Sequence, residues 1–317
     1  MSKKIALITG ITGMDGSHLA DLLISKDYQI YGLIRRSASP NLWRIAHILE
    51  GIELVYGDLT DQTSLDNVIR SVKPDEIYNL AAQSYVAYSF SSPITTSDIT
   101  GLGVLRLLES MRQYAPNARF FQASSSEMFG KIQESPQKET TRFYPRSPYG
   151  TAKAFAHYTC VNYREAYKLH VSCAIMFNHE SPRRGEEFVT RKITKGIATY
   201  KATGQKISLG NLNASRDWGH ASDYMAGAYQ MLQQDKPDDY ILATGEVHTV
   251  KEWLEEACKV GGVDFWDVYT QNPAFERQAE VDYLRGDYSK AKQVLGWEPK
   301  IRFKELVKEM VESDDGS

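Results

Sequence analysis

The sequence has few cysteines, and they are unevenly spaced. Cys160, Cys173 and Cys258 are the three cysteines in 317 residues. An odd number at wide spacings fits neither a disulfide framework nor a paired-cysteine metal site, so we expect no bound metal here. We expect reduced thiols that are buried as small hydrophobic side chains. This usage favours a cytosolic protein over a disulfide-stapled secreted domain.

Long apolar runs and blocks of basic residues are also missing. The first apolar run, Ile5–Ile8, ends at Thr9, which is too short for a signal peptide, and no stretch of about 20 apolar residues follows that could span a bilayer. Charges of both signs are interspersed and the net charge is -3. A nucleic-acid or anionic-membrane surface is therefore not indicated. We expect a cytoplasmic protein with a small ligand and no membrane or nucleic-acid partner.

Short apolar runs alternate with amphipathic stretches through the first half of the chain. This order predicts βα units, and hence an α/β fold with a Rossmann-type doubly wound parallel sheet and a smaller C-terminal substrate-binding α/β domain. A chain of 317 residues with 42% hydrophobic content can bury both cores. Strands are expected at Ile5–Thr9, Gln29–Leu33, Glu53–Tyr56, Glu76–Asn79, Arg119–Ala123 and Val171–Phe177, and helices near Gly16–Lys26, Leu42–Leu49, Thr63–Val72, Ile99–Tyr114 and Pro148–Tyr167.

The regular alternation stops after Phe177. The segment His179–Gly185 is rich in Pro, Gly and Arg, which predicts a loop. We expect one domain over residues 1–178, to which residues 212–245 return, and a second mainly over residues 179–317. The last residues, Glu312–Ser317, are expected to fray. In the second half we expect helices near Thr190–Thr203, Ala221–Gln234 and Val250–Val260, and a strand at Tyr240–Thr244.

A glycine-rich loop follows the first expected strand and opens the first helix. Its spacing is G-x-x-G-x-x-G, which lets backbone N–H groups and the helix N-terminus approach a pyrophosphate. A glycine triplet alone is a weak signal, but the strand before it and the helix after it are the context of a dinucleotide-binding loop. The expected contacts are Gly10, Thr12, Gly13, Met14, Asp15 and Gly16.

The end of the second expected strand lacks the acid that NAD enzymes use to bind the adenosine ribose. The chain reads Arg35, Arg36 and Ser37 instead, and the planar fork of arginine pairs well with a phosphate group. This favours NADP, although a solvated arginine pair in a loop is the alternative interpretation. Further cofactor contacts are expected at the ends of the third and fourth strands, at Asp58, Leu59, Leu80, Ala82, Gln83 and Ser84.

Tyr149 and Lys153 form a Tyr-x-x-x-Lys pair at the start of a predicted helix. The i, i+4 spacing places both side chains on one helix face. An ammonium nearby favours the phenolate, so we expect Tyr149 to lose its proton closer to neutral pH and to act on a sugar hydroxyl. Lys153 and Tyr149 are also expected to contact the cofactor.

The fifth expected strand ends in a serine-rich stretch that includes Ser125 and Glu127. A hydroxyl here, with Tyr149 and Lys153, is sufficient for a sugar reductase or epimerase. Glu127 adds a possible base for the C5 proton of a 4-keto hexose, whose removal precedes loss of the C6 hydroxyl as water. A carboxylate that stabilises a helix start is the alternative interpretation of Glu127.

Taken together, these residues resemble the extended short-chain dehydrogenase/reductase family, and within it the GDP-mannose 4,6-dehydratases. The resemblance covers nearly the whole chain and implies an NADP-binding first domain and a nucleotide-sugar-binding second domain. It implies catalysis by Ser125, Glu127, Tyr149 and Lys153. The motifs that carry it are Tyr78–Ser84, Pro136–Thr141, Phe143–Tyr149, Val161–Tyr167, Phe177–Gly185, Phe188–Ile193, Leu209–Leu212, Arg216–His220 and Ala243–Glu246.

The resemblance also implies further binding residues. His179 and Arg184 would contact the cofactor, although a buried structural histidine is an equal reading of His179 from its residue type. Arg216 and Arg277 would pair with the substrate diphosphate. The implied nucleotide-sugar pocket consists of Ser84, Ser125, Glu127, Asn178, Val189, Lys192, Asn211, Arg216, Arg277 and Glu280.

The chain departs from the family pattern at three places. Ser125 stands where a threonine is usual, which keeps the hydroxyl, and Met14 replaces a glutamine in the glycine loop. The segment between Val260 and Arg277 is shorter than in most members. Because this segment borders the sugar-nucleotide pocket, the identity of the sugar is less certain than the reaction type.

The expected activity is conversion of GDP-D-mannose to GDP-4-keto-6-deoxy-D-mannose and water through an internal NADP redox cycle. A GDP-D-glycero-D-manno-heptose 4,6-dehydratase is one alternative, a nucleotide-sugar epimerase or reductase is a second, and a non-enzymatic NADP-sensing protein is a third. The resemblance implies a homodimer or homotetramer. Leu42 and Trp43, in the loop from Arg35 to about Arg44, are apolar residues suited to such an interface.

Overall fold

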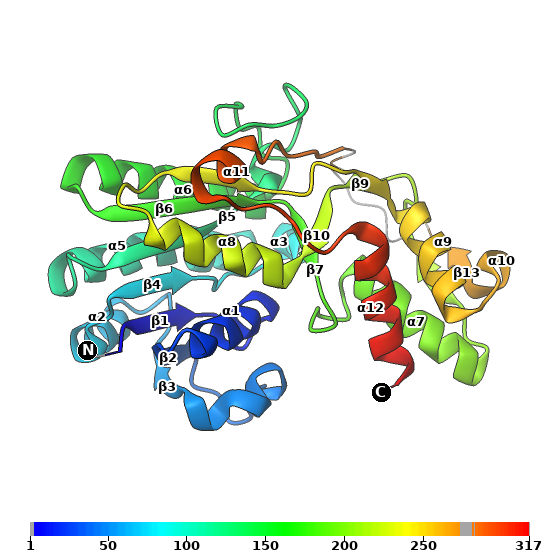
Figure 1. Ribbon diagram of the computed structural model, residues 1–317, viewed down its shortest axis with the longest axis horizontal. Coiled ribbons are helices and arrows are strands. Elements are labelled where there is room, and N and C mark those ends of the chain that lie inside the picture. Colours follow the sequence, from blue (N-terminus) through cyan, green and yellow to red (C-terminus); the bar gives the residue numbers. More distant parts are fainter. Residues whose placement is uncertain (1–2, 273–280, 282, 317) are drawn as a thin grey trace.

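The computed structural model describes residues 3–272, 281 and 283–316, and its centre is a seven-stranded sheet (Figure 1). The strand order is β11-β6-β5-β4-β1-β2-β3, and every neighbouring pair is parallel. The order reverses beside β1, so the connections diverge there and leave a crevice at the carboxyl ends of the strands. The strands are β1 Ile5–Thr9, β2 Gln29–Ile34, β3 Glu53–Tyr56, β4 Glu76–Asn79, β5 Arg119–Ser125, β6 His170–Met176 and β11 Asp239–Leu242.

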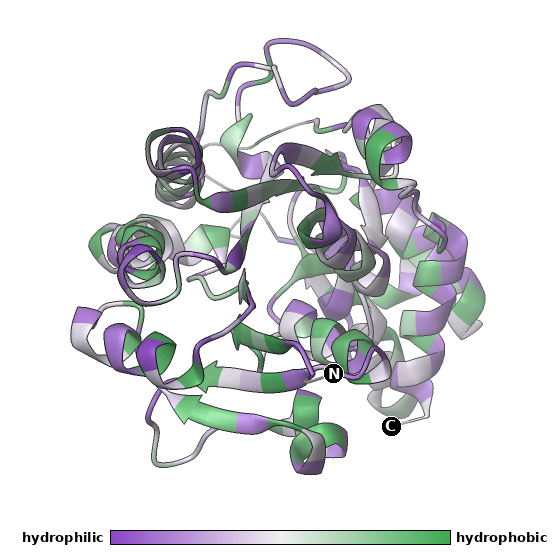
Figure 2. Cartoon of the chain, turned by 60° about the vertical axis from the view of Figure 1, so that its left-hand side comes forward, coloured by the Kyte–Doolittle hydropathy of each residue, from purple (hydrophilic) through white to green (hydrophobic). Residues whose placement is uncertain are grey.

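Helices cover both faces of this sheet, because its strands are apolar on both sides. One apolar core joins the sheet to α1 and α8, and a second joins it to α2, α5 and α6. Figure 2 shows hydrophobic residues on the strands and hydrophilic residues on the outward sides of the helices. The three layers place the carboxyl ends of β1, β4, β5 and β6 at one edge. The helices are α1 Met14–Ser25, α2 Gln62–Val72, α5 Gly103–Tyr114, α6 Pro148–Tyr167 and α8 Ala221–Gln233.

A smaller lobe lies beyond that edge of the sheet (Figure 1). Its core contains Ile197, Trp253, Leu306 and Val311, from three helices that pack on one another. Short strand pairs join this lobe to the crevice: β7 with β10, β9 with β12, and β8 with β13. The helices are α7 Val189–Thr203, α9 Val250–Gly261, α10 Phe265–Val268 and α12 Phe303–Asp315, and the strands are β7 Asn178–Glu180, β8 Ile207–Leu209, β9 Ser215–Arg216, β10 Trp218–His220, β12 His248–Thr249 and β13 Tyr269–Gln271.

The expected strands and long helices are confirmed, most of them to within two residues. Three expectations are wrong. The helix near Leu42–Leu49 is a 3-10 helix, η1 Trp43–Gly51, and the loop predicted from His179 starts inside β7 because Trp218–His220 pairs with it. The end of the chain does not fray before Asp315, because Asp314 is buried and accepts a hydrogen bond from Thr194.

Several short elements were not expected from the sequence. Three lie between β4 and α6 or near the C-terminal end: α3 Val86–Ser91, α4 Pro93–Ser97 and α11 Ser289–Leu295. The helix expected near Ile99–Tyr114 begins with a π-helical turn, η2 Asp98–Leu102, before α5. A 3-10 turn, η3 Ser126–Met128, continues β5. All three cysteines are buried and free, as expected. Within the described part of the chain, no helix is both long and apolar enough to cross a membrane.

Candidate active site

A cavity of about 580 Å³ lies where the carboxyl ends of the sheet meet the smaller lobe. It brings together residues predicted from distant parts of the sequence. The sheet contributes residues from the ends of β4, β5 and β6, and the smaller lobe contributes residues from α7 and β9. The predicted site residues that line it are Asp15, Leu80, Ala82, Ser84, Ser125, Glu127, Tyr149, Lys153, Asn178, His179, Arg184, Val189, Lys192, Asn211 and Arg216.

The four predicted catalytic residues come from three elements, β5, η3 and α6, that are fixed to one another. Ser125 is the last residue of β5, and its Oγ accepts from the N–H of Glu127 at 3.2 Å, so η3 begins there. Tyr149 and Lys153 lie on α6, and Lys153 Nζ donates to the carbonyl oxygen of Ala123 at 2.6 Å. That bond ties α6 to the end of β5. The cavity therefore presents a hydroxyl, a carboxyl group, a phenol and an amine together.

Tyr149 is buried, and burial raises its pKa to about 12. A hydrogen bond with the Ser125 hydroxyl acts in the opposite direction, while the Glu127 charge raises the pKa further. Lys153 Nζ lies 5.7 Å from the centre of the Tyr149 ring. The expectation that Lys153 brings the phenol close to neutral pH is therefore wrong for this state of the site, because burial outweighs the lowering influences.

The charged form of Lys153 is destabilised by its surroundings. Burial lowers its pKa to about 8, against a favourable influence of the Asp15 carboxylate. An amine with a pKa near 8 can gain or lose a proton close to neutral pH. Lys153 can therefore exchange a proton with its surroundings near neutral pH, whereas Tyr149 keeps its proton there.

The glycine loop has the close contacts that its sequence predicts. Gly10 has φ +72, and a Cβ there would lie 2.8 Å from the backbone nitrogen of Ala81. A Cβ on Gly16 would lie 2.3 Å from the carbonyl oxygen of Gly10. Gly13 is the N-cap of α1 and provides no side-chain cap, so the first N–H groups of the helix face the crevice without a side-chain acceptor from that position. These groups suit a pyrophosphate.

Asp15 and His179 form an ion pair across the crevice. His179 Nε2 lies 3.0 Å from both oxygens of Asp15, and Nδ1 lies 2.7 Å from the carbonyl oxygen of Phe177. Both nitrogens face acceptors, so the ring is an imidazolium that donates from each. Burial alone would lower the pKa of His179, but the Asp15 carboxylate raises it. The pair joins the start of α1 to β7.

The arginines predicted to select the cofactor lie at one end of the crevice. Arg35, Arg36 and Ser37 directly follow β2 and are exposed. Asp58 follows β3, and its Oδ1 accepts from the N–H and hydroxyl of Thr60 at 2.9 and 2.8 Å. The structure places both groups at carboxyl ends of strands, on the side of β1 away from the catalytic residues. Of the remaining predicted contacts, Leu59 follows Asp58 after β3, Thr12 lies in the glycine loop, Met14 is the first residue of α1, and Gln83 lies in the segment after β4.

Arg184, predicted as a cofactor contact, is held by two groups that the sequence analysis did not single out, Glu180 and Phe188. Its Nε lies 3.0 Å from Glu180, and its guanidinium lies 3.5 Å from the centre of the Phe188 ring. Glu180 is buried and also accepts from the Thr190 hydroxyl at 2.8 Å. Both partners line the cavity. Glu180 and Phe188 lie next to the predicted residues His179 and Val189 in the motifs Phe177–Gly185 and Phe188–Ile193, and this proximity in the sequence could have indicated them.

Two predicted substrate residues cannot be placed. Arg277 and Glu280 lie outside the described residues. Arg216 is buried, lines the cavity, and donates from Nη1 to the carbonyl oxygen of Ser215 at 2.9 Å.

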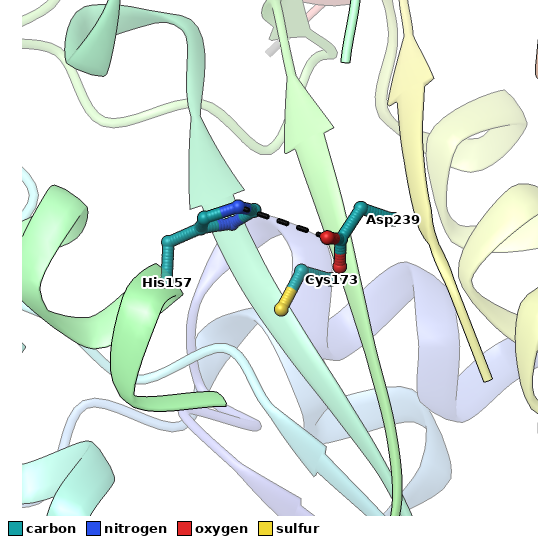
Figure 3. A group of neighbouring side chains, drawn as sticks. All are labelled: His157, Cys173 and Asp239. Carbon is teal, nitrogen blue, oxygen red and sulfur yellow. Dashed lines mark ion pairs between the residues drawn. The ribbon is translucent and has the colours of Figure 1, made fainter. Parts of the chain in front are cut away.

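A buried cluster behind the active site contains His157, Cys173 and Asp239 (Figure 3). Its potential ligand atoms lie within 4.8 Å of one another. Both Asp239 oxygens accept from Arg164 at 2.8 Å, and His157 Nδ1 lies 3.0 Å from the Ser124 hydroxyl. The arginine already balances the carboxylate charge, so the arrangement favours a structural network between α6, β6 and β11 over a cation site.

Comparison with known proteins adds a family match over most of the chain. The model of the family described as GDP-mannose 4,6 dehydratase matches residues 7–310. The GDP-mannose 4,6 dehydratase of Cricetulus griseus is 49% identical over 340 residues, with 98% of this chain and 91% of that protein covered. The GDP-mannose 4,6 dehydratase 2 of Arabidopsis thaliana is 52% identical over 325 residues, with 98% of this chain and 87% of that protein covered.

The fold is shared more widely than the sequence. The crystal structure of UDP-glucose 4-epimerase from Thermotoga maritima with UDP-glucose superposes with a TM-score of 0.88 at 24% identity, and 98% of each chain is covered. At this identity the likeness shows the fold alone. Residues of the site, and not the arrangement of strands and helices, must therefore distinguish a dehydratase from an epimerase.

Proposed function

The chain belongs to the GDP-mannose 4,6-dehydratase family, and from that premise we propose that it converts GDP-D-mannose to GDP-4-keto-6-deoxy-D-mannose and water. One observation carries the choice of reaction: Glu127 lines the same cavity as Tyr149 and Lys153. A 4-epimerase or a reductase needs the phenol and the amine, but it has no step for a carboxylate base. A dehydratase needs a base for the C5 proton.

NADP is the cofactor that the crevice fits best. The N–H groups at the start of α1 would hold the pyrophosphate, and Arg35, Arg36 and Ser37 would hold the 2′-phosphate. Asp58 would face the adenine, and His179, Arg184 and Lys153 would lie toward the nicotinamide half. The exposed arginines suit a phosphate dianion, since a ribose diol would need an acidic acceptor there. When bound, NADP supplies reversible hydride acceptance.

The residues of the cavity have distinct tasks in this reaction. Tyr149 accepts the C4 hydroxyl proton after its own phenol proton has left, and Ser125, whose hydrogen bond lowers the pKa of Tyr149, holds the sugar O4. Lys153, with a pKa lowered to about 8 by burial, supplies or takes up a proton beside them. Glu127 removes the C5 proton of the 4-ketone and gives a proton to the departing C6 hydroxyl, so one water leaves. Glu127 is then a carboxylate again. It takes up from solvent the equivalent of the C4 hydroxyl proton that Tyr149 releases, and it delivers that proton to C5 as the hydride removed from C4 returns to C6.

The nucleotide sugar is proposed to span the cavity from β5 to the smaller lobe. Asn178, Val189, Lys192 and Asn211 line that side, and Arg216, which also lines the cavity, would pair with the diphosphate. Arg277 and Glu280 are proposed to complete this pocket. Because the chain between Val260 and Arg277 is short, GDP-D-glycero-D-manno-heptose is the competing substrate that an experiment must include.

Mass spectrometry of the products tests the reaction and the substrate together. The purified protein is incubated with GDP-mannose and, separately, with GDP-manno-heptose, both without added cofactor and with NADP supplied. We expect loss of one water from GDP-mannose, and in heavy water the gain of one deuterium at C5. Water loss from the heptose substrate alone would change the substrate assignment, and water loss from neither would remove the dehydratase assignment.

A matched variant tests the role of Glu127 separately from the roles of Ser125, Tyr149 and Lys153. Glu127→Gln keeps the size of the side chain but cannot take the C5 proton. We expect it to bind NADP and GDP-mannose as the wild type does, while water loss falls by about 10²-fold or more. Unchanged turnover in this variant would make Glu127 a structural carboxylate.

We further propose that the protein is a cytoplasmic homo-oligomer, with a dimer as its smallest unit. Of the two apolar residues after β2 that suit an interface, Leu42 packs on the core of the sheet, whereas Trp43 is half exposed. A larger apolar surface lies on the outer side of α4, η2 and α6, where Ile94, Leu102 and Phe155 are exposed. α4 and η2 pack against α6, so these residues lie on one face of neighbouring helices.

A further inference from the structure

Arg216 and Asp217 are neighbours in the chain with side chains on opposite sides of the backbone. They lie where β9, which pairs with β12, leads into β10, which pairs with β7. Successive side chains of an extended segment point in opposite directions. Arg216 lines the cavity, while Asp217 has no exposed surface and lies behind it. Figure 1 shows this segment between the sheet and the smaller lobe.

The carboxylate of Asp217 collects hydrogen bonds from two other segments. Oδ1 accepts from both the N–H and the hydroxyl of Thr244 at 2.7 Å. Oδ2 accepts from the N–H of Gly245 at 2.9 Å and from the N–H of Gly286 at 3.2 Å. Thr244 and Gly245 follow β11, the edge strand of the main sheet. Consecutive N–H groups of this kind form a concave anion site, and here a side chain of the same molecule occupies it.

The segment that contains Gly286 can approach the end of β11 only because it has a glycine at this position. A Cβ on Gly286 would lie 2.3 Å from the Cβ of Ala243 and 2.8 Å from the Phe177 ring. Backbone bridges join the same stretch to its neighbours, with Tyr283 beside Ser215 and Gly286 beside Gln137. The segment that returns from the smaller lobe is therefore packed tightly against the end of β11, with Asp217 between them.

This arrangement fixes geometry more than it stabilises the fold. Burial raises the pKa of Asp217 to about 6, even though its hydrogen bonds favour the charged form. Removing a carboxylate from water is costly, and charge-assisted hydrogen bonds offset only part of that cost. The gain is a single, defined position for the backbone on either side of Asp217.

We propose that Asp217 is a positioning residue, which holds Arg216 in the cavity by fixing β9 to the end of β11 and to the segment at Gly286. The proposal rests on the proposed function, in which Arg216 binds the substrate diphosphate. A guanidinium that is already in place loses little freedom when the diphosphate arrives, so affinity rises. Asp217 does not contact the reacting atoms, so it should affect substrate binding and leave the chemical step almost unchanged.

Asp217→Asn tests the proposal. The NH₂ group of asparagine cannot accept a hydrogen bond, so one side of the side chain would lose the bonds that Asp217 accepts from its neighbours. We expect the KM for GDP-mannose and the Kd for GDP to rise by about tenfold, with kcat within about threefold and the NADP content per chain unchanged. Thr244→Val removes the hydroxyl donor to Asp217, together with the hydroxyl's bond from the N–H of Glu246, but keeps the N–H donor of residue 244. It should give a smaller change in the same direction. This second variant keeps the test decisive if Asp217→Asn fails to fold.

A double-mutant cycle shows whether Asp217 acts through Arg216. In an Arg216→Ala background, Asp217→Asn should raise the Kd for GDP by less than about twofold, because the positioned group is already missing. Equal effects in both backgrounds would overturn the proposal, as would an unchanged Kd in Asp217→Asn and Thr244→Val.

The matched control is Asp223→Asn. Asp223 is also buried and accepts from two backbone N–H groups, those of Lys300 and Ile301, at 2.8 and 2.9 Å. This control should destabilise the fold without changing the Kd for GDP; an equal rise would mean that general loosening explains the effect. Binding of GDP is measured without turnover, so a wild type that binds GDP but does not dehydrate GDP-mannose would reject the proposed function and leave this proposal standing.

Discussion

At the scale of single residues, Lys153 links the chemistry of the site to the stability of the fold. Burial lowers its pKa to about 8, whereas an unfolded lysine has a pKa near 10.5. Between these two values the unfolded chain binds more protons than the folded chain, so the free energy of unfolding rises with pH through this group. At pH 7 the buried ammonium opposes folding, and the catalytic role proposed for Lys153 would explain why this cost is retained.

Lys153→Met provides a measurement of this cost. The variant lacks the titrating group, so its free energy of unfolding relative to wild type should fall by about 2 kcal/mol between pH 7 and pH 9.5. Urea unfolding at the two pH values measures the difference, and all other titrating groups cancel. The variant should also lose dehydratase activity. A difference that does not change with pH would show that Lys153 is not a buried ammonium in the folded protein.

At the scale of elements, the start of α6 determines where Tyr149 lies. Ser147 is the N-cap, and its Oγ accepts from the N–H of Gly150 at 3.0 Å. Ser147→Ala should lower the free energy of unfolding by about 1 kcal/mol and reduce kcat, because Tyr149 lies in the first turn that the cap holds. Ser147→Thr keeps the hydroxyl and should restore both.

Asp61 supplies the comparison for this prediction. It caps α2, far from the cavity, and accepts from the N–H of Thr63 at 3.0 Å. Asp61→Ala should cost a similar amount of stability and leave kcat unchanged, as measured by urea unfolding and initial rates. Equal loss of kcat in both cap variants would mean that stability alone, and not the position of Tyr149, controls the rate.

Elements with a strong local signal could be predicted from the sequence, and those that depend on distant partners could not. β1 and α6 were predicted at their observed bounds, since alternating apolar runs, Pro148 and the N-cap serine are local features. β7 was missed because it exists only through pairing with Trp218–His220. The helical end at Asp314 depends on Thr194, which is distant in the sequence.

At the scale of the whole molecule, motif spacing predicted which residues would meet but not how they would affect one another. Ser125, Glu127, Tyr149 and Lys153 line one cavity, because the C-terminal end of β5 and the N-terminal end of α6 lie at the same edge of the sheet. The raised pKa of Tyr149 could not be predicted, because it depends on the burial created by the assembled site. Burial is a property of three packed layers and has no counterpart in a linear pattern.

The apolar surface on α4, η2 and α6 gives a prediction about assembly. Ile94 is 81% exposed on α4, and the exposed Phe155 on α6 lies beside Gly101 of η2, where a Cβ would lie 3.3 Å from its ring. The three elements pack on one another, so apolar side chains are exposed on neighbouring helices. Exposing such a surface to water is unfavourable, and a second copy with the same surface can cover it around a two-fold axis. We expect light scattering to give a dimer or a tetramer for the wild type.

Replacing Ile94 and Phe155 together with Glu should halve that mass, since four charges would meet across the two-fold axis. The matched control is Trp266→Glu, which changes a residue that is 73% exposed on α10, on the smaller lobe, and should leave the mass unchanged. A tetramer that falls to a dimer would place a second interface elsewhere, with the half-exposed Trp43 as the first residue to test. An unchanged mass in the double variant would show that this surface is not where the copies meet.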